Sequence, residues 1–168
     1  MKYTNGNLLD LAEQGKFDII VQGCNCQNTM NSGIAKQIRE RYPKAYLADQ
    51  VTQKGDLGKL GCFTQAYING TRLDSAQHPV HYSFTVLNAY TQAQYGYDQK
   101  QYVDYDAVGR VFKQIKLLYD MNPMSAIKIG IPMIGTTRGG GDWTVIESII
   151  EGLNFSDLTV VCYNEDEQ

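Results

Sequence analysis

Two stretches rich in small and polar residues hold the side chains of this sequence with the clearest potential for chemistry. The first, "CNCQNTMNSGIAKQI", begins at Cys24, and the second, "IGTTRGGGDWTVI", begins at Ile134. Each follows an apolar run and precedes a helical pattern, so each can turn several backbone N–H groups toward one point beside a helix N-terminus. Together they predict a site for a small anion with two linked phosphates, or with a phosphate and a sugar.

The residues of these loops explain why backbone would be the binding group. Glycine has no Cβ to hold the backbone away from a ligand and permits positive φ. Neither loop has the G-x-x-x-x-G-K-[ST] or G-x-G-x-x-G pattern, and one such loop alone could be a long flexible turn. The loop residues that we expect at the site are Asn31, Ser32 and Gly33, and then Gly135, Thr136, Thr137, Gly139, Gly140 and Gly141.

The cysteines and histidines do not have the spacing of a metal or redox site. Cys24 and Cys26 are two residues apart, and neither Cys62 nor Cys162 completes a zinc pattern. We therefore expect reduced thiols that pack as small residues, and we expect neither a metal nor a cofactor.

Length, composition and net charge restrict the classes of protein to which this chain can belong. The chain has 168 residues, of which 43% are hydrophobic and 20% charged, with a net charge of −3. No Lys/Arg cluster is available for phosphate contacts along a duplex, so we expect no nucleic-acid partner. The first ten residues lack the apolar core of a signal peptide, and no run approaches the length of a membrane span. We expect a cytoplasmic protein without a membrane partner.

Alternating strands and helices favour one α/β domain over residues 1–168. Short apolar runs predict strands at 17–23, 61–68, 80–88, 126–133 and 158–164. Helical patterns cover 7–14, 33–42, 108–119 and 143–153, and Pro43 interrupts the second. Asp104 or Asp106 can cap the third. This order predicts a mostly parallel central sheet with helices on both faces. The Tyr/Gln-rich stretch 90–105 is expected to be a surface loop, which could form part of a site wall or a surface for a partner.

These motifs resemble those of macro domains, the ADP-ribose-binding α/β modules. The resemblance runs from "YTNGNLLD" through "GCNCQNTMNSGIAKQIRERYP" and "IPMIGTTRGGGDW" to "VVCYNED". It is strongest to a branch of ADP-ribose 1''-phosphate phosphatases typified by a yeast enzyme. The resemblance implies a three-layer α/β/α sandwich with a mixed, mostly parallel sheet.

The resemblance also implies roles for individual residues. Asn7 and Leu8 would meet the adenine edge, although Asn7 is equally suited to cap a helix. Asn25 would orient the distal ribose, with a satisfied polar group at a strand end as the alternative. Tyr163 would pack on the adenine, or be a packing residue of an edge strand.

The two loops carry the phosphate contacts in this family. The first diphosphate loop would be Asn31, Ser32, Gly33, Ile34 and Ala35, and the second would run from Gly135 to Gly141. Cys24 and Cys26 would be packing residues with backbone contacts at most.

Candidates for catalysis lie at the second loop. Asp142 could position a water as general base, or simply cap the last helix. Arg138 could hold a terminal phosphate, or be an exposed loop residue. Other candidates are Asn25, Thr136, Thr137 and the ligand's own phosphate.

The sequence also departs from related enzymes. The yeast-type branch carries a His where this chain has Gln22, which cannot take a proton. A branch that removes ADP-ribose from protein glutamates uses a Lys and an Asp, which would fall near Gln92 and Gly139 here.

The leading functional hypothesis is therefore a metal-independent phosphatase that converts ADP-ribose 1''-phosphate to ADP-ribose and phosphate. The alternatives are a reader that binds ADP-ribose, free or on a protein, and a hydrolase of ADP-ribosyl-carboxylate esters. We expect a monomer.

Overall fold

The computed structural model describes residues 1–121 and 124–163. Its elements follow in the order β1 (Lys2–Asn5), α1 (Leu8–Glu13), β2 (Ile19–Asn25), α2 (Gly33–Arg41), α3 (Pro43–Gln50), a 3₁₀ turn (Leu57–Lys59), β3 (Phe63–Leu73), β4 (Pro79–Gln92), α4 (Tyr105–Tyr119), β5 (Ile129–Ile131), α5 (Trp143–Glu151) and β6 (Leu158–Cys162).

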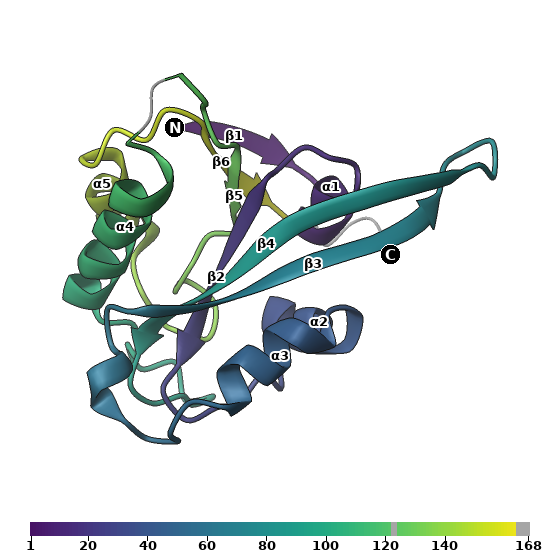
Figure 1. Cartoon of the computed structure of the whole chain (residues 1–168). Helices are drawn as coiled ribbons and strands as arrows, with labels where there is room; N and C mark the ends of the chain where they lie inside the picture. The colour runs from purple at the N-terminus through teal and green to yellow at the C-terminus, as the bar shows by residue number, and fades with distance from the viewer. Residues whose placement is uncertain (122–123, 164–168) are drawn as a thin grey trace.

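One six-stranded sheet forms the centre of the molecule, in the order β1-β6-β5-β2-β4-β3 (Figure 1). Every neighbouring pair is parallel except β3 with β4. The expectation of a mixed, mostly parallel sheet is confirmed. The carboxyl ends of the parallel strands consequently meet along one edge of the sheet, where ligands bind in open α/β folds.

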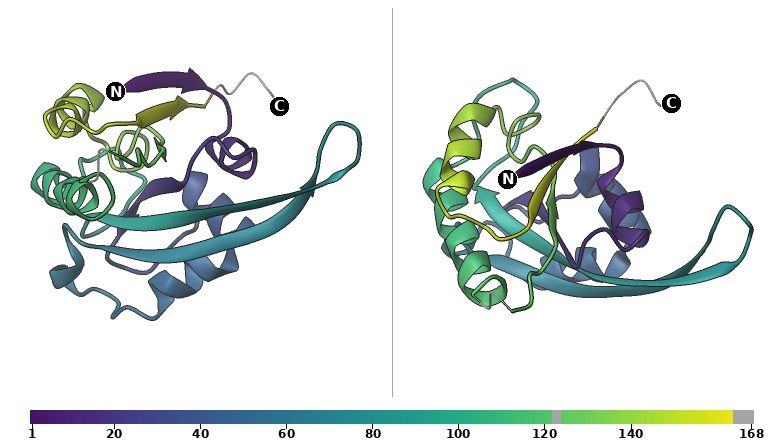
Figure 2. Two further views of the ribbon diagram at one scale, coloured as in Figure 1. Left: turned by 45° about the horizontal axis from the view of Figure 1, so that its top comes forward. Right: turned by 90° about the horizontal axis from the view of Figure 1, so that it is seen from above.

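Helices cover both faces of this sheet, which confirms the three-layer α/β/α arrangement. Helices α4 and α5 lie side by side on one face, where Phe112 and Ile146 join a core with Leu87 and Ile131 of the strands (Figure 2). Helices α1, α2 and α3 cover the other face, where Ile38 is fully buried. Burial of apolar side chains on two faces gives the central strands their continuous hydrophobic runs.

Three helices begin at the polar residues that the sequence favours as caps. Asn7 accepts hydrogen bonds from the backbone N–H groups of Leu9 and Asp10, at 2.9 and 3.2 Å. Asp104 accepts from Ala107 N at 2.9 Å, and Asp142 accepts from Thr144 N at 2.8 Å. Pro43 ends the predicted 33–42 helix but also opens α3, because a proline is tolerated in the first helical turn.

The predicted strands 61–68 and 80–88 are shorter than the real ones. β3 and β4 pair in an antiparallel ladder from Phe63 with Ala89 to Leu73 with Pro79, and the hairpin projects beyond the rest of the sheet (Figures 1 and 2). The sequence did not predict this extension of the two strands, because exposed polar residues in the hairpin interrupt the apolar runs that predict strands.

The other strand boundaries differ by smaller amounts. β4 continues to Gln92, so residues 90–92 of the stretch expected to be a loop are buried strand. β5 is restricted to Ile129–Ile131 within the predicted 126–133. β6 ends at Cys162, and residue 164 of the predicted strand 158–164 lies outside the described residues.

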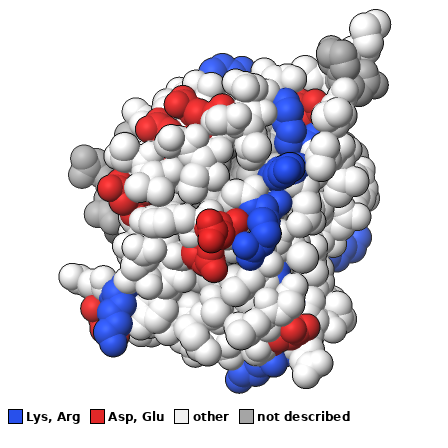
Figure 3. All heavy atoms as spheres, turned by 90° about the vertical axis from the view of Figure 1, so that its left-hand side faces the viewer, with Lys and Arg blue, Asp and Glu red and all other residues white. Residues whose placement is uncertain are grey.

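On the side where α4 and α5 lie, the described residues carry side chains of both charges. Figure 3 shows basic and acidic side chains interspersed there among uncharged residues. Within residues 1–121 and 124–163, no helix has the length and apolar character needed to cross a membrane.

Candidate functional site

A cavity of about 530 Å³ opens at the carboxyl ends of the parallel strands. Its walls come from the segments that follow β1, β2, β4, β5 and β6. This volume lies within the range of small-molecule sites, and the position is the one that the topology favours. The two loops expected from the sequence therefore face one common space.

The structure brings most of the predicted ligand residues to this cavity. Those that line it are Asn7, Leu8, Cys24, Asn25, Asn31, Ser32, Gly33, Ile34, Ala35, Gly135, Thr136, Thr137, Arg138, Gly139 and Tyr163. Three predicted site residues, Gly140, Gly141 and Asp142, are not part of the lining.

The loop between β2 and α2 holds its shape through its own side chains. Asn25 accepts a hydrogen bond from Gln27 N at 2.9 Å and donates from Nδ2 to Thr29 Oγ1 at 2.7 Å. Asn31 accepts from Arg39 of α2 at 2.6 Å. Gly33 has φ of +55° with open space where a Cβ would stand. Backbone at the start of α2 is thus left open toward the cavity.

The loop after β5 folds tightly on itself. Gly135 has φ of +77°, and Thr136 Oγ1 donates to Met133 O at 2.8 Å. The carbonyl of Gly139 accepts from the backbone N–H groups of Tyr102 and Val103, at 2.7 and 3.0 Å. These bonds join this loop to residues 93–104, which we call the tyrosine loop.

The roles expected for Gly140, Gly141 and Asp142 need correction. A Cβ on Gly140 would lie 2.3 Å from the carbonyl oxygen of Lys100, and one on Gly141 would lie 2.5 Å from a methyl carbon of Val103. Both glycines therefore allow the tyrosine loop to approach, instead of facing the cavity. Asp142 caps α5, because its carboxylate accepts a hydrogen bond from the backbone N–H group of Thr144 at 2.8 Å. The structure supports the capping role and offers no cavity-facing position for Asp142 as a base.

Charge is scarce in the cavity wall. Among the described residues that line it, Arg138 is the one with a side chain charged at neutral pH, and no Asp, Glu, His or Lys is present. The Arg138 guanidinium lies 4.5 Å from the ring centre of Tyr97. A wall with one cation and no carboxylate suits an anionic ligand, because no fixed negative charge repels it.

A buried polar cluster beneath the first loop was not foreseen from the sequence. Lys59 donates to Asn28 Oδ1 at 2.6 Å and to Thr52 Oγ1 at 3.0 Å, and its ammonium lies 5.1 Å from the Tyr90 ring centre. Tyr90 donates to Asp49 at 2.8 Å, and burial raises the pKa of Asp49. Asn28 has φ of +56°, so this cluster fixes the turn that leads to Asn31.

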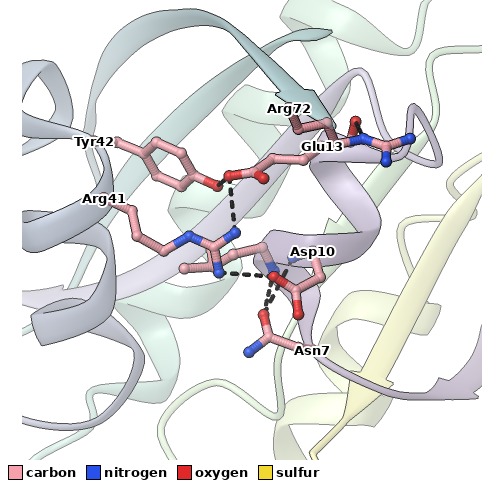
Figure 4. Close-up of polar contacts among 7 residues, drawn as sticks. Asn7, Asp10, Glu13, Arg41, Tyr42 and Arg72 are labelled. Carbon is pink, nitrogen blue, oxygen red and sulfur yellow. Dashed lines mark hydrogen bonds and ion pairs between the residues drawn. The ribbon is translucent and has the colours of Figure 1, made fainter. Parts of the chain in front are cut away.

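A second polar network joins α1 to the end of α2, outside the cavity lining. Arg41 of α2 forms ion pairs with Asp10 and Glu13 of α1, each at 2.8 Å, and Tyr42 donates to Glu13 at 2.6 Å (Figure 4). The Asn7 cap lies at the start of the same α1. The network therefore sets the distance between the two helices that begin at the cavity.

Gln22 and Cys24 are both buried. Gln22 is fully buried, donates to Asn88 Oδ1 at 2.8 Å and does not line the cavity. Cys24 does line it, and burial raises the pKa of its thiol, which keeps it neutral. All four cysteines are unpaired, and no group of three His, Cys, Asp or Glu side chains among the described residues is arranged to hold a metal.

Sequence reasoning missed several lining residues. They include Gly6, Thr29, Gln37, Gln92, Tyr95, Gly96, Tyr97, Met133 and Val161. The Tyr/Gln composition of 90–105 was the available signal for Tyr95 and Tyr97, which lie in the cavity lining.

Comparison with known proteins connects this geometry to a family. No family model matches the chain. The chain is 34% identical over 152 residues to an uncharacterized 17.5 kDa protein from the tk-vs intergenic region of Enterobacteria phage T4, covering 90% of this chain and 88% of that protein. The chain belongs to the family of this phage protein.

More distant relatives identify the architecture. The chain is 25% identical over 149 residues to a DNA ADP-ribosyl glycohydrolase of Mycobacterium tuberculosis, covering 86% of this chain and 36% of the relative, so it spans about a third of that protein. The macrodomain of Thermus aquaticus DarG superposes with a TM-score of 0.63 at 17% identity, covering 97% of each chain. Thermosipho africanus DarTG, whose structure holds ADP-ribose, superposes with a TM-score of 0.64 at 12% identity over all of this chain and 43% of the other. The fold is that of a macrodomain.

Proposed function

We propose that the cavity binds the ADP-ribosyl group. The observation that carries this proposal is one cavity faced by two backbone-rich loops, with Arg138 as its cation and no carboxylate in its described wall. Backbone N–H groups at the start of α2 would bind the diphosphate. The relative that acts on ADP-ribosyl groups and the DarTG structure with ADP-ribose support the same ligand.

The order of the strands suggests how the ligand lies. Asn7 follows β1 and Tyr163 follows β6, at one end of the sheet, whereas the tyrosine loop follows β4 near the other. We assign the adenine to Asn7, Leu8 and Tyr163, and the distal ribose to the end near Asn25 and the tyrosine loop. Because Asn7 Oδ1 already caps α1, its contact with adenine would use its remaining hydrogen-bonding capacity.

Hydrolysis of ADP-ribose 1''-phosphate is the second candidate function. Arg138 favours it, because a guanidinium at the ribose end suits a terminal phosphate. With no side-chain base in the described wall, the water would be oriented by groups such as Asn25, Thr136 or Thr137, or by the ligand's own phosphate. A non-hydrolysing reader and a hydrolase of ADP-ribosyl-carboxylate esters use the same binding residues and differ in turnover.

A calorimetric titration separates these possibilities. We expect ADP-ribose to bind with micromolar affinity, and adenosine, which lacks the diphosphate, to bind at least about ten-fold more weakly, a difference of about 1.4 kcal/mol. ADP-ribose 1''-phosphate is then added and phosphate release is followed. Release supports the phosphatase, and binding without release supports the reader or the ester hydrolase. Absence of ADP-ribose binding would contradict the proposed function.

A further inference from the structure

Asn7 lies at the end of the cavity to which the base of the ligand is assigned. β1 pairs with β6 as far as Asn5 with Cys162, and Gly6 N donates to Cys162 O at 3.0 Å. Asn7 and Tyr163 therefore follow two neighbouring strands at the same point, and both line the cavity. A base held at this end would meet the hydrogen-bonding groups that Asn7 has free.

The side-chain oxygen of Asn7 is already used within the protein. Oδ1 accepts hydrogen bonds from Leu9 N at 2.9 Å and from Asp10 N at 3.2 Å. A carbonyl oxygen has two lone pairs, so these two bonds use its accepting capacity. They also establish which amide atom is the oxygen, because an NH₂ group in that place would face two further donors. Asn7 is left with donors only.

The side-chain nitrogen of Asn7 is free to meet a ligand. Figure 4 shows it on the side of the amide that is turned away from the start of α1. It has no hydrogen-bond partner among residues 1–121 and 124–163, and Asn7 is half-buried. Its two N–H groups therefore take their acceptors from a ligand or from water.

A side chain with donors only distinguishes purines by their group at position 6. Adenine has an amino group there, which donates, whereas guanine and hypoxanthine have an oxygen, which accepts; N7 accepts in each of them. Asparagine recognises adenine by accepting from the amino group and donating to N7. Asn7 can make only the second of these bonds, and no carboxylate in the described cavity wall replaces the first.

We propose that Asn7 sets the base specificity of the cavity, so that the cavity takes the diphosphate ribose of a 6-oxopurine at least as well as ADP-ribose. This inference rests on the proposed function, which places a purine nucleotide in the cavity with its base at Asn7. The amino group of adenine would face the N–H donors of Asn7, whereas the oxygen of a 6-oxopurine pairs with them. A polar group left unpaired in a closed site weakens binding, which is how such a site discriminates between ligands.

An Asn7→Asp variant reverses the polarity of this one group. Asp caps a helix as well as Asn does, so one carboxylate oxygen keeps the two bonds to α1. The other oxygen takes the place of the nitrogen, accepts from the amino group of adenine and repels the oxygen of a 6-oxopurine. The added negative charge acts on both ligands alike, because they share one diphosphate. The ratio of the two affinities therefore isolates the contact with the base.

Calorimetry with ADP-ribose and inosine diphosphate ribose measures this ratio, because the two ligands differ only at position 6 and in the proton on N1. We expect the wild type to bind inosine diphosphate ribose at least as tightly as ADP-ribose. Asn7→Asp should shift the ratio toward ADP-ribose by about ten-fold or more.

Asp74→Asn in the projecting hairpin is the matched control. Asp74 Oδ1 likewise accepts from two backbone N–H groups, those of Ala76 and His78, both at 2.9 Å, and Asp74 does not line the cavity. This exchange of the same two residue types should leave the ratio of affinities unchanged. Thermal unfolding of both variants checks that each is folded.

Two results would overturn the base specificity while leaving the proposed function intact. One is a wild type that binds ADP-ribose more tightly than inosine diphosphate ribose, a comparison that needs no variant. The other is a folded Asn7→Asp variant with the same ratio of affinities as the wild type. If the wild type binds neither ligand, the proposed function fails, and the base specificity fails with it.

Discussion

Polar side chains in the two cavity loops mostly bind the protein's own loops. Asn25 bonds within the first loop, Asn31 bonds to Arg39, and Thr136 bonds to Met133 O. Each of these contacts holds the backbone beside the cavity in place. It also uses part of the hydrogen-bonding capacity of the side chain, which is then not available to a ligand. Residue types alone therefore predicted two loops that line one cavity, but not that several of their side chains bond within the protein.

Asp142, a candidate base that the structure shows as a helix cap, gives the clearest case of a side chain used within the protein. Asp142→Ala should lower the free energy of unfolding by about 1 kcal/mol through loss of the α5 cap, and the melting temperature by about 2–4 °C. Asp142→Ser, which can still cap, should retain stability. ADP-ribose affinity should match the wild type in both variants, because Asp142 does not line the cavity. Thermal unfolding and calorimetry measure the two quantities, and lost affinity with unchanged melting would restore Asp142 to the binding site.

At the scale of elements, the sequence predicts features that depend on neighbouring residues, but not contacts between residues far apart in the chain. The sequence predicts Asn7 and Asp142 as caps, and Asp104 or Asp106 as the cap of α4, from residues within one helical turn; the structure has Asp104 in this role. The Lys59–Asn28 contact joins residues 31 positions apart, so no local pattern reveals it. The hairpin ladder likewise pairs residues of two different strands, such as Asn69 with Ser83 and Thr71 with His81. The sequence predicts that the glycine run faces a ligand, whereas Gly140 and Gly141 lie against the tyrosine loop.

The contact between these two loops can be tested at Gly140. Gly140→Ala should weaken ADP-ribose binding about ten-fold, or about 1.4 kcal/mol, by displacing the tyrosine loop through the clash with Lys100 O. It should also cost about 1–2 kcal/mol of stability, because φ is +63°. Gly15→Ala is the matched control: its φ is +78°, with nothing within 4 Å of the added Cβ. Equal affinities of the two variants would show that the loop contact does not shape the site.

At the scale of the molecule, the cavity and the hairpin lie at opposite ends of β4. β4 runs parallel to β2 toward the cavity, whereas its start at Pro79 pairs with Leu73 near the projecting tip. The cavity draws its walls from segments distant in sequence, which only the assembled sheet brings together. Sequence could predict this convergence, because parallel strands share one carboxyl edge. It could not predict the length of the projecting hairpin.

The most direct test of the account is hydrogen exchange measured with and without ADP-ribose. One ligand bound between both loops should slow exchange of backbone amides at 27–35 and at 134–139 together, and leave the hairpin residues 67–83 unchanged. Backbone protection is the relevant readout, since backbone N–H groups are the main proposed ligands of the diphosphate. Protection of both loops at one ligand concentration would support a single ADP-ribose site. Binding that protects neither loop, or that protects only the hairpin, would contradict it.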